Sequence, residues 1–240
     1  MGTITKTIIT AAILGSAGIA GATPTFTAIN NSSGEVSQAG LFHTVYGGTW
    51  TVQADGRSFS NGVMTATRVA DGGVASPLTI QTSTATSADD QGWSAGTQVT
   101  IVAKTRFAAD SHNFGWIDDS TAPFSGPGFQ VITPTSSLNT PVTVPLSTSF
   151  RWALKDLSTN QLLTSRPSDN PNGGADVMAT YRITGSSNPG ATWLLVWEDR
   201  TSNSDRDFND SAIEVSAVPT PGTLTLAGLG VMFAGRRRRR

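Results

Sequence analysis

The chain has 240 residues and a formal net charge of −1 at pH 7, and only 14% of its residues are charged, against roughly 25% in a typical soluble protein. It has no cysteine, which excludes a disulfide framework, a thiol nucleophile and any cysteine-based zinc or iron–sulfur site. Its two histidines, His43 and His112, argue against a histidine-rich metal site. Gly, Ser, Thr and Pro are abundant instead, and they favour turns and strands over long helices.

The N-terminal residues 1–22 have the parts of a secretory signal peptide. One positive charge, Lys6, precedes an apolar run from Ile8 to Ala20, and the sequence AGA at Ala20–Ala22 is a small-residue cleavage site. A buried N-terminal helix is the alternative, but the run is dense in Gly and Ala and lacks a polar face. We therefore predict that the protein is exported.

A short helix or turn is predicted at residues 34–46. Ser32 and Glu35 have the spacing of a capping box, and Gly47 follows as a stop signal. His43 has no nearby acid or nucleophile, so we interpret it as a structural or surface histidine and not as a catalytic base. The side chains predicted to point inward are Leu41, Phe42 and Val45.

Beyond this helix, three segments alternate apolar and polar residues with a period of two, which predicts half-buried antiparallel strands. Their predicted inward faces carry Val99, Ile101, Ala103 and Phe107; Phe150, Trp152 and Leu154; and Val177, Ala179, Tyr181 and Ile183. Their predicted outward faces carry Lys104 and Arg106; Arg151 and Lys155; and Thr180 and Arg182. Residues 192–197 (TWLLVW) are apolar on both faces, which predicts a central strand.

Many short strands separated by turn clusters predict an all-β fold, an antiparallel, jelly-roll-like β-sandwich with one short N-terminal helix. We see no internal repeat, so residues 23–217 are predicted to form one domain. Residues 84–96 and 110–128 are predicted to be long irregular segments. The further strand candidates are 49–54, 63–69, 78–82, 129–133, 142–144 and 211–217.

The densest polar feature is the sequence WEDRTSNSDRDFNDSAIEV, which holds six of the chain's 17 acidic residues between positions 198 and 214. Its D-x-D-x-N run places several oxygen donors close together, which suits a hard cation such as Ca²⁺. The pattern is not an EF-hand, because Asp210 occupies the required glycine position and Ser216 the position of the final Glu. The candidate ligands are Glu198, Asp199, Asp205, Asp207, Asn209 and Asp210, with Asp176 as a weaker contributor.

Two other interpretations of this cluster remain open. Asp and Asn could cap the turns of an exposed hairpin, or Asp207 and Asp210 could pair with Arg200 and Arg206 in a surface network. Calcium is favoured because bunched carboxylates without a cation repel one another. Asp176 has its own alternative, a turn residue that precedes a strand.

An enzyme is not predicted. The chain contains no G-x-S-x-G, H-E-x-x-H or P-loop sequence and no convincing His–acid arrangement, although Glu198 and Asp199 could in principle serve a glycoside hydrolase. A carbohydrate-binding module is a better alternative. The tryptophans that could stack on sugar rings in such a module are Trp50, Trp93 and Trp116.

The C-terminal residues 218–240 have three parts: Pro219-Thr220-Pro221, an uncharged and mostly apolar stretch at 222–235, and five arginines. The apolar stretch is short for a membrane span, which needs about 20 residues, and the positive charge after it favours the cytoplasmic side. These features predict a transient inner-membrane anchor in the precursor. The arginines are Arg236, Arg237, Arg238, Arg239 and Arg240.

The charge of the rest of the chain argues against a nucleic-acid function for this arginine run. Without Lys6 and the five arginines, Lys plus Arg falls from 16 to 10 against 17 acidic residues, so the body carries about −7. Such a body repels nucleic acid and attracts cations.

The tail resembles the PEP-CTERM sorting signal of bacterial surface proteins, here with Thr220 in place of the central Glu. The resemblance implies an exosortase-type membrane processing enzyme as partner. It also implies a bacterial host with an envelope rich in exopolysaccharide.

The sequences LFHTVYGGTW, VMTATRV, ADVMATYRITG and the acidic segment together resemble a bacterial extracellular domain of unknown function that is often found in PEP-CTERM proteins. The resemblance covers most of residues 35–216, and its closing E-D…D-x-D-[FY]-N-D motif implies calcium. In many relatives a His follows the position of Asp176, where this chain has Val177. We therefore expect a structural or adhesive β-sandwich at the cell surface or in the extracellular matrix, with a carbohydrate-binding module as the alternative.

Overall fold

The computed structural model describes residues 26–31, 33–69, 74–75, 78–80, 91–95, 98–118, 128–146, 149–185 and 192–217. The predicted signal peptide and C-terminal sorting segment lie outside these residues. Among the described helices, none combines the length and apolar character that a membrane crossing requires.

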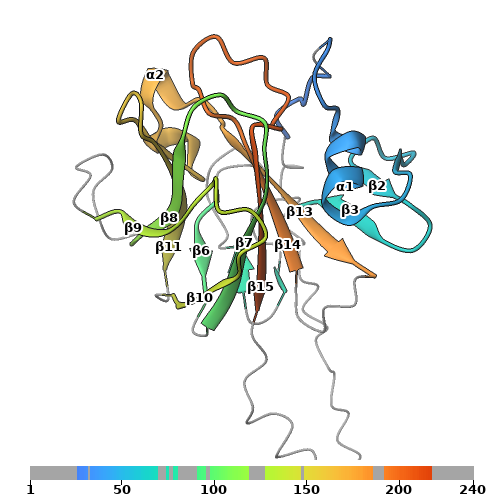
Figure 1. Ribbon diagram of the computed structural model, residues 1–240, viewed down its shortest axis with the longest axis horizontal. Coiled ribbons are helices and arrows are strands. Elements are labelled where there is room, and N and C mark those ends of the chain that lie inside the picture. Colours follow the sequence, from blue (N-terminus) through green and yellow to red (C-terminus); the bar gives the residue numbers. More distant parts are fainter. Residues whose placement is uncertain are drawn as a thin grey trace, which may run out of the picture.

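Two antiparallel sheets make up the described part of the chain, which confirms the predicted all-β sandwich (Figure 1). The larger sheet has the order β1 (Thr51–Val52), β2 (Ser58–Ser60), β3 (Thr65–Arg68), β13 (Met178–Thr184), β14 (Thr192–Trp197), β15 (Ser211–Ala217), β7 (Gln98–Arg106) and β10 (Val142–Pro145). The smaller has the order β4 (Val74–Ala75), β5 (Leu78–Ile80), β6 (Trp93–Ser94), β11 (Phe150–Asp156), β8 (His112–Asp118) and β9 (Gln130–Pro134), and β12 (Leu162–Thr164) pairs with β11.

Apolar side chains form two separate cores, one on each face of the larger sheet. The first lies between the sheets and contains the indole rings of Trp93, Trp152, Trp193 and Trp197. The second lies under α1 (Gln38–Tyr46), where Phe42 packs edge-on against Tyr181 with ring centroids 4.9 Å apart. Strand β14 contributes to both cores, which confirms the prediction that residues 192–197 form a central strand.

Helix α1 begins later than the sequence predicts. Ser37 and not Ser32 is the N-cap, and its hydroxyl accepts a hydrogen bond from the backbone N–H of Gly40 at 3.3 Å. The predicted capping box is therefore wrong, because the helix begins three residues beyond Glu35; Ser32 itself lies outside the described residues. Gly47 ends the helix with a φ of 72°, as predicted.

The predicted irregular segment at 110–128 contains a strand in its first half. Strand β8 lies between β11 and β9, and its inward residues His112 and Phe114 are buried. Gly115 permits this position, because a Cβ there would lie 2.0 Å from the backbone oxygen of Gln130. The predicted segment at 84–96 likewise contains β6.

Three predicted side-chain orientations are wrong. Thr180 is buried, not outward, and its hydroxyl donates to the side-chain oxygen of Gln91 at 2.6 Å. Phe107 is exposed, because β7 ends at Arg106 and the backbone N–H of Phe107 instead donates to the oxygen of Asp210 at 2.8 Å. Arg151 is buried, because its guanidinium forms an ion pair with Asp169 of the 3₁₀ turn η1 (Pro167–Asp169). A single helical turn, α2 (Pro171–Gly174), follows η1.

Candidate cation site at the β14–β15 loop

The loop between β14 and β15 lies beside the segment that leads into α1 (Figure 1). Three hydrogen bonds join them: the Asn30 backbone N–H donates to the oxygen of Arg206 at 2.9 Å, the Asn30 side chain donates to the oxygen of Asp205 at 2.7 Å, and the Asn209 side chain donates to the oxygen of Val36 at 2.8 Å. Two stretches from opposite ends of the chain thus form one polar surface.

The loop backbone is strained at two positions. Arg206 and Phe208 have φ values of 60° and 52°, in the left-handed region that bulky residues rarely adopt. Such conformations persist only where surrounding contacts fix them. Phe208 is fully buried in the core under α1, and Gln38 donates to the backbone oxygen of Asp207 at 2.6 Å.

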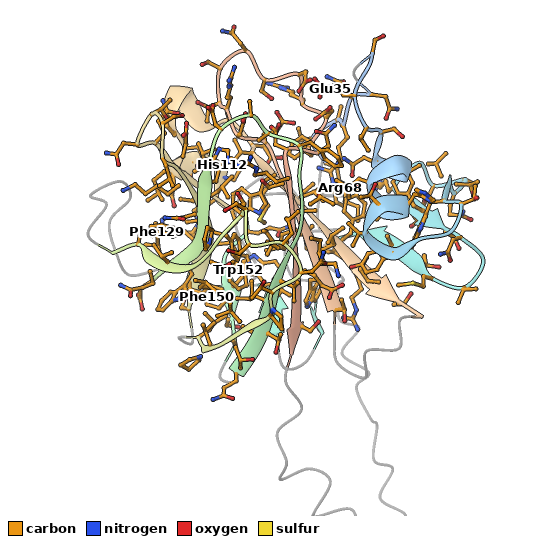
Figure 2. The ribbon with its side chains drawn as sticks, viewed as in Figure 1. Glu35, Arg68, His112, Phe129, Phe150 and Trp152 are labelled. Atoms are coloured by element: carbon orange, nitrogen blue, oxygen red, sulfur yellow. The ribbon has the colours of Figure 1, made fainter. Side chains whose placement is uncertain are left out.

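Three carboxylates converge on this surface. Glu35, Asp205 and Asp207 each place a carboxylate oxygen within 4.8 Å of the other two. Figure 2 shows Glu35 next to the loop. Glu35 and Asp205 are exposed, whereas Asp207 is only 2% exposed. Among the described residues, no Lys or Arg forms an ion pair with any of the three.

The pKa of Asp207 reflects this crowding. Burial, the hydrogen bond with Glu35 and the charges of Asp205 and Glu198 together raise it to about 8. The Asn209 backbone N–H lowers it in part. At neutral pH the cluster therefore holds a proton that a bound cation would displace.

The other predicted ligands line the same cavity but hold the loop together. The buried carboxylate of Glu198 accepts hydrogen bonds from the Ser204 hydroxyl and the Phe208 backbone N–H. Burial raises the pKa of Glu198 despite these bonds. The Asn209 side-chain amide donates to Asp207 as well as to Val36.

Asp210 and Asp199 lie at the start and end of the adjoining strands. Asp210 accepts a hydrogen bond from the backbone N–H of Asp199 at 2.8 Å, and burial raises its pKa to about 7. Asp199 has a raised pKa, mainly through burial, and pairs with the exposed Arg200 at 3.6 Å. Arg200 also contacts Asp110 at 3.4 Å. Among the described residues, neither Asp207 nor Asp210 forms the predicted ion pair with Arg200 or Arg206.

A cavity of about 560 Å³ connects these groups. Its walls include Glu35, Glu198, Asp199, Asp205 and Asp210, and Phe107 and Ala108 close one side. The arrangement supplies oxygen ligands for a hard cation. It also contains acidic groups with raised pKa values, which could act as proton donors in a reaction.

The remaining sequence candidates lie elsewhere. Asp176 accepts a hydrogen bond from the Met178 backbone N–H at 3.3 Å, as a turn residue before a strand does. His43 is exposed and contacts the backbone oxygen of Gly48. Trp93 and Trp50 are buried and Trp116 is half-buried, so the first two offer no face for a sugar.

Glu35 is the site residue that sequence reasoning assigned to another role. Its spacing from Ser32 matches a helix cap, and no local pattern links it to the distant D-x-D-x-N run. His112, on β8, was considered only as one of two histidines. It is 1% exposed, burial lowers its pKa, and neither ring nitrogen has a hydrogen-bond partner among the described residues.

Comparison with known families matches residues 134–218 to a domain of unknown function, DUF4114. The match runs from the end of β9 past β15 and includes Asp205 and Asp207, whereas Glu35 and α1 lie outside it. No curated protein and no solved structure matches the chain.

Proposed function

We propose that the protein is an exported, structural or adhesive β-sandwich of the bacterial cell surface or extracellular matrix, stabilised by Ca²⁺ at the β14–β15 loop. The observation that carries the proposal is the convergence of the carboxylates of Glu35, Asp205 and Asp207 within 4.8 Å. They would supply charged ligands to the ion, and Glu198, Asn209 and Asp210 would hold the loop in shape around it.

Calcium is the preferred cation because it accepts six to eight oxygen ligands in a flexible geometry. Glu35 and Asp205 line an open cavity with space for water, which can supply further oxygen ligands. Zinc sites in proteins are built mainly from nitrogen and sulfur ligands, and neither histidine belongs to the carboxylate group.

The role proposed for the ion is to join two segments of the chain. Glu35 precedes α1, whereas Asp205 and Asp207 belong to the loop between two central strands. An ion that binds all three would stabilise the folded state by mass action, by about 2.7 kcal/mol at a free concentration one hundred times its dissociation constant. This suits a protein that works outside the cell, where calcium is plentiful.

Thermal unfolding of the full chain, with calcium or with a chelator, tests the proposal. We expect calcium to raise the melting temperature of the wild type, and the Glu35→Gln variant to lose most of that increase. Both Glu35 and Asp205 are exposed, so neither Glu35→Gln nor Asp205→Asn should prevent folding.

Asp55→Asn is the matched control, since Asp55 is an exposed carboxylate that binds the backbone of its own turn. Its melting temperature will change, but its response to calcium should equal that of the wild type. If the wild type melts at the same temperature with calcium and with chelator, the calcium site does not exist.

The raised pKa of Glu198 favours a second candidate function, an enzyme, because a glycoside hydrolase needs a protonated carboxyl group in its cleft. Turnover of a polysaccharide that is lost on Glu198→Gln but kept on Glu35→Gln would favour this alternative over a structural role.

The sorting proposal rests on the N- and C-terminal sequences, which lie outside the described residues. Export through residues 1–22 and processing at Pro219-Thr220-Pro221 by an exosortase-type enzyme would release the acidic body from the membrane. Mass spectrometry of the mature protein from its host would show whether residues 1–22 and Arg236 to Arg240 are removed.

A further inference from the structure

A second cavity, of about 750 Å³, lies between the N-terminal segment 26–31, the start of α1 and the β1–β2 hairpin. Its volume falls within the roughly 300–1,000 Å³ that small-molecule sites occupy. It shares no lining residue with the acidic cavity. Its chemistry is also different, because no acidic residue is among the described residues that line it.

The charge of this cavity comes from two arginines. The guanidinium of Arg57 lies 4.6 Å from the ring centre of Phe26, and that of Arg68 lies 5.3 Å from the same ring. Arg68 is buried and donates to the backbone oxygen of Thr27 at 2.7 Å, so it fixes the wall of the cavity. Arg57 is exposed at the surface.

Arg57 has no carboxylate partner among the described residues. The nearest candidate in sequence, Asp55, accepts hydrogen bonds from the backbone N–H groups of Arg57 and Ser58 at 2.9 and 2.8 Å, and from the Ser58 hydroxyl. The carboxylate thus holds its own turn in place while the guanidinium of Arg57 stays over the Phe26 ring. A planar group with several N–H donors is left available to an anion from outside.

The rest of the lining is apolar or neutral. Phe26 and the half-buried Phe59 contribute aromatic rings, and Thr27 and Asn31 contribute polar groups. A simple inorganic anion would need only the arginines. Arginine beside aromatic rings instead suits a ligand that has a carboxylate on a ring with one apolar face.

We propose that this cavity binds a carboxylated sugar, namely a uronic acid unit of a polysaccharide. Arg57 binds the carboxylate, the aromatic rings pack against the apolar face of the sugar ring, and the polar side chains meet its hydroxyl groups. The inference does not require the calcium site. It places carbohydrate recognition on phenylalanine and arginine, whereas the sequence suggests tryptophan.

Isothermal titration of the full chain with a trimer of galacturonic acid tests the inference. We expect saturable binding that weakens as salt is added, since the contact is partly ionic. The neutral trimer of galactose should bind at least about tenfold more weakly, because it lacks the group that Arg57 recognises.

Substitutions then locate the site. Arg57→Gln should weaken binding of the acidic trimer about tenfold and leave the weak binding of the neutral trimer unchanged. Phe26→Ala should weaken binding of both sugars, because the ring packs against either one. Lys155→Gln is the matched control: it removes one positive charge from β11 of the other sheet, outside the cavity, and should bind as the wild type does.

Each other result overturns the inference. Equal binding of the acidic and neutral trimers, or an Arg57→Gln variant that binds the acidic trimer as tightly as the wild type, removes the role of the charge. Binding of a short peptide through its C-terminal carboxylate, without binding of the sugar, assigns the cavity to a peptide instead. Repeating the titration with chelator separates this inference from the proposed function, because loss of calcium stabilisation leaves the two arginines in place.

Discussion

Two clusters in this molecule each contain a buried carboxylate, but the charges around the two carboxylates are opposite. In the smaller sheet, Asp169 is buried against the guanidinium of Arg151, which also donates to the backbone oxygen of Asp118. At the β14–β15 loop, Asp207 is buried as deeply, but its neighbours are the carboxyl groups of Glu35, Asp205 and Glu198.

The two clusters therefore differ in whether the buried carboxylate already has a positively charged partner. The Arg151–Asp169 pair carries its own counter-charge and requires no further group. Burial and the neighbouring carboxyl groups raise the pKa of Asp207 to about 8, and among the described residues no Lys or Arg forms an ion pair with it. A structural role accounts for the first cluster, whereas the second favours a bound cation.

Breaking the complete pair should have the largest effect. Asp169→Ala removes the buried carboxylate that pairs with Arg151, so we expect the free energy of unfolding to fall by about 3–5 kcal/mol. Chemical denaturation measures this loss. The double variant Arg151→Met and Asp169→Ala should recover most of the lost free energy of unfolding, because an apolar side chain needs no counter-charge. A double variant as unstable as Asp169→Ala would show that the loss does not come from the charge of Arg151.

The acidic cluster should respond to pH in a way that calcium removes. Because the pKa values of Asp207 and Asp210, about 8 and 7, are raised above their ordinary values, the folded state binds more protons than the unfolded state between about pH 4 and 8. In chelator, the two protonated carboxyl groups therefore contribute to the free energy of unfolding. This contribution is fully present below about pH 4 and is lost as the pH rises through 8. We expect a lower melting temperature at pH 8.5 than at pH 5.

Calcium should reverse part of this fall in melting temperature, because calcium binding displaces the proton of the cluster. Calcium affinity should therefore rise with pH, by about tenfold per pH unit below pH 8 if one proton is released. Calcium titrations at pH 6, 7 and 8 measure this slope. An affinity that does not change with pH would mean that no carboxyl group with a raised pKa takes part.

The smallest expected effect is a gain in stability. Asp205→Asn removes one of the repelling charges next to Asp207, so in chelator the variant should melt at a slightly higher temperature than the wild type. The gain is about 1 kcal/mol at most, because Asp205 is exposed and solvent screens its charge. A lower melting temperature in chelator would mean that Asp205 stabilises the fold without a cation.

Much of the fold was predictable, because burial on one face leaves a period of two in the sequence. Strand β7 shows that pattern through Val99, Ile101 and Ala103, all buried as predicted. Strand β8 was missed because His112 and Gly115 interrupt its apolar pattern, and both are explained only by their neighbours on adjacent strands. Arg151 was placed outward because sequence alone does not reveal a counter-charge such as Asp169.

The sequence by itself determined the all-β class, the central position of residues 192–197 and the acidic run that contains Asp205 and Asp207. These follow from local composition and periodicity, which each segment carries by itself. Only the tertiary structure decided that Glu35 joins this run and that Arg57 lies over Phe26 in a second cavity. The physical reason is that packing of α1 and its flanking segments on one face of the larger sheet brings together residues that no local pattern connects.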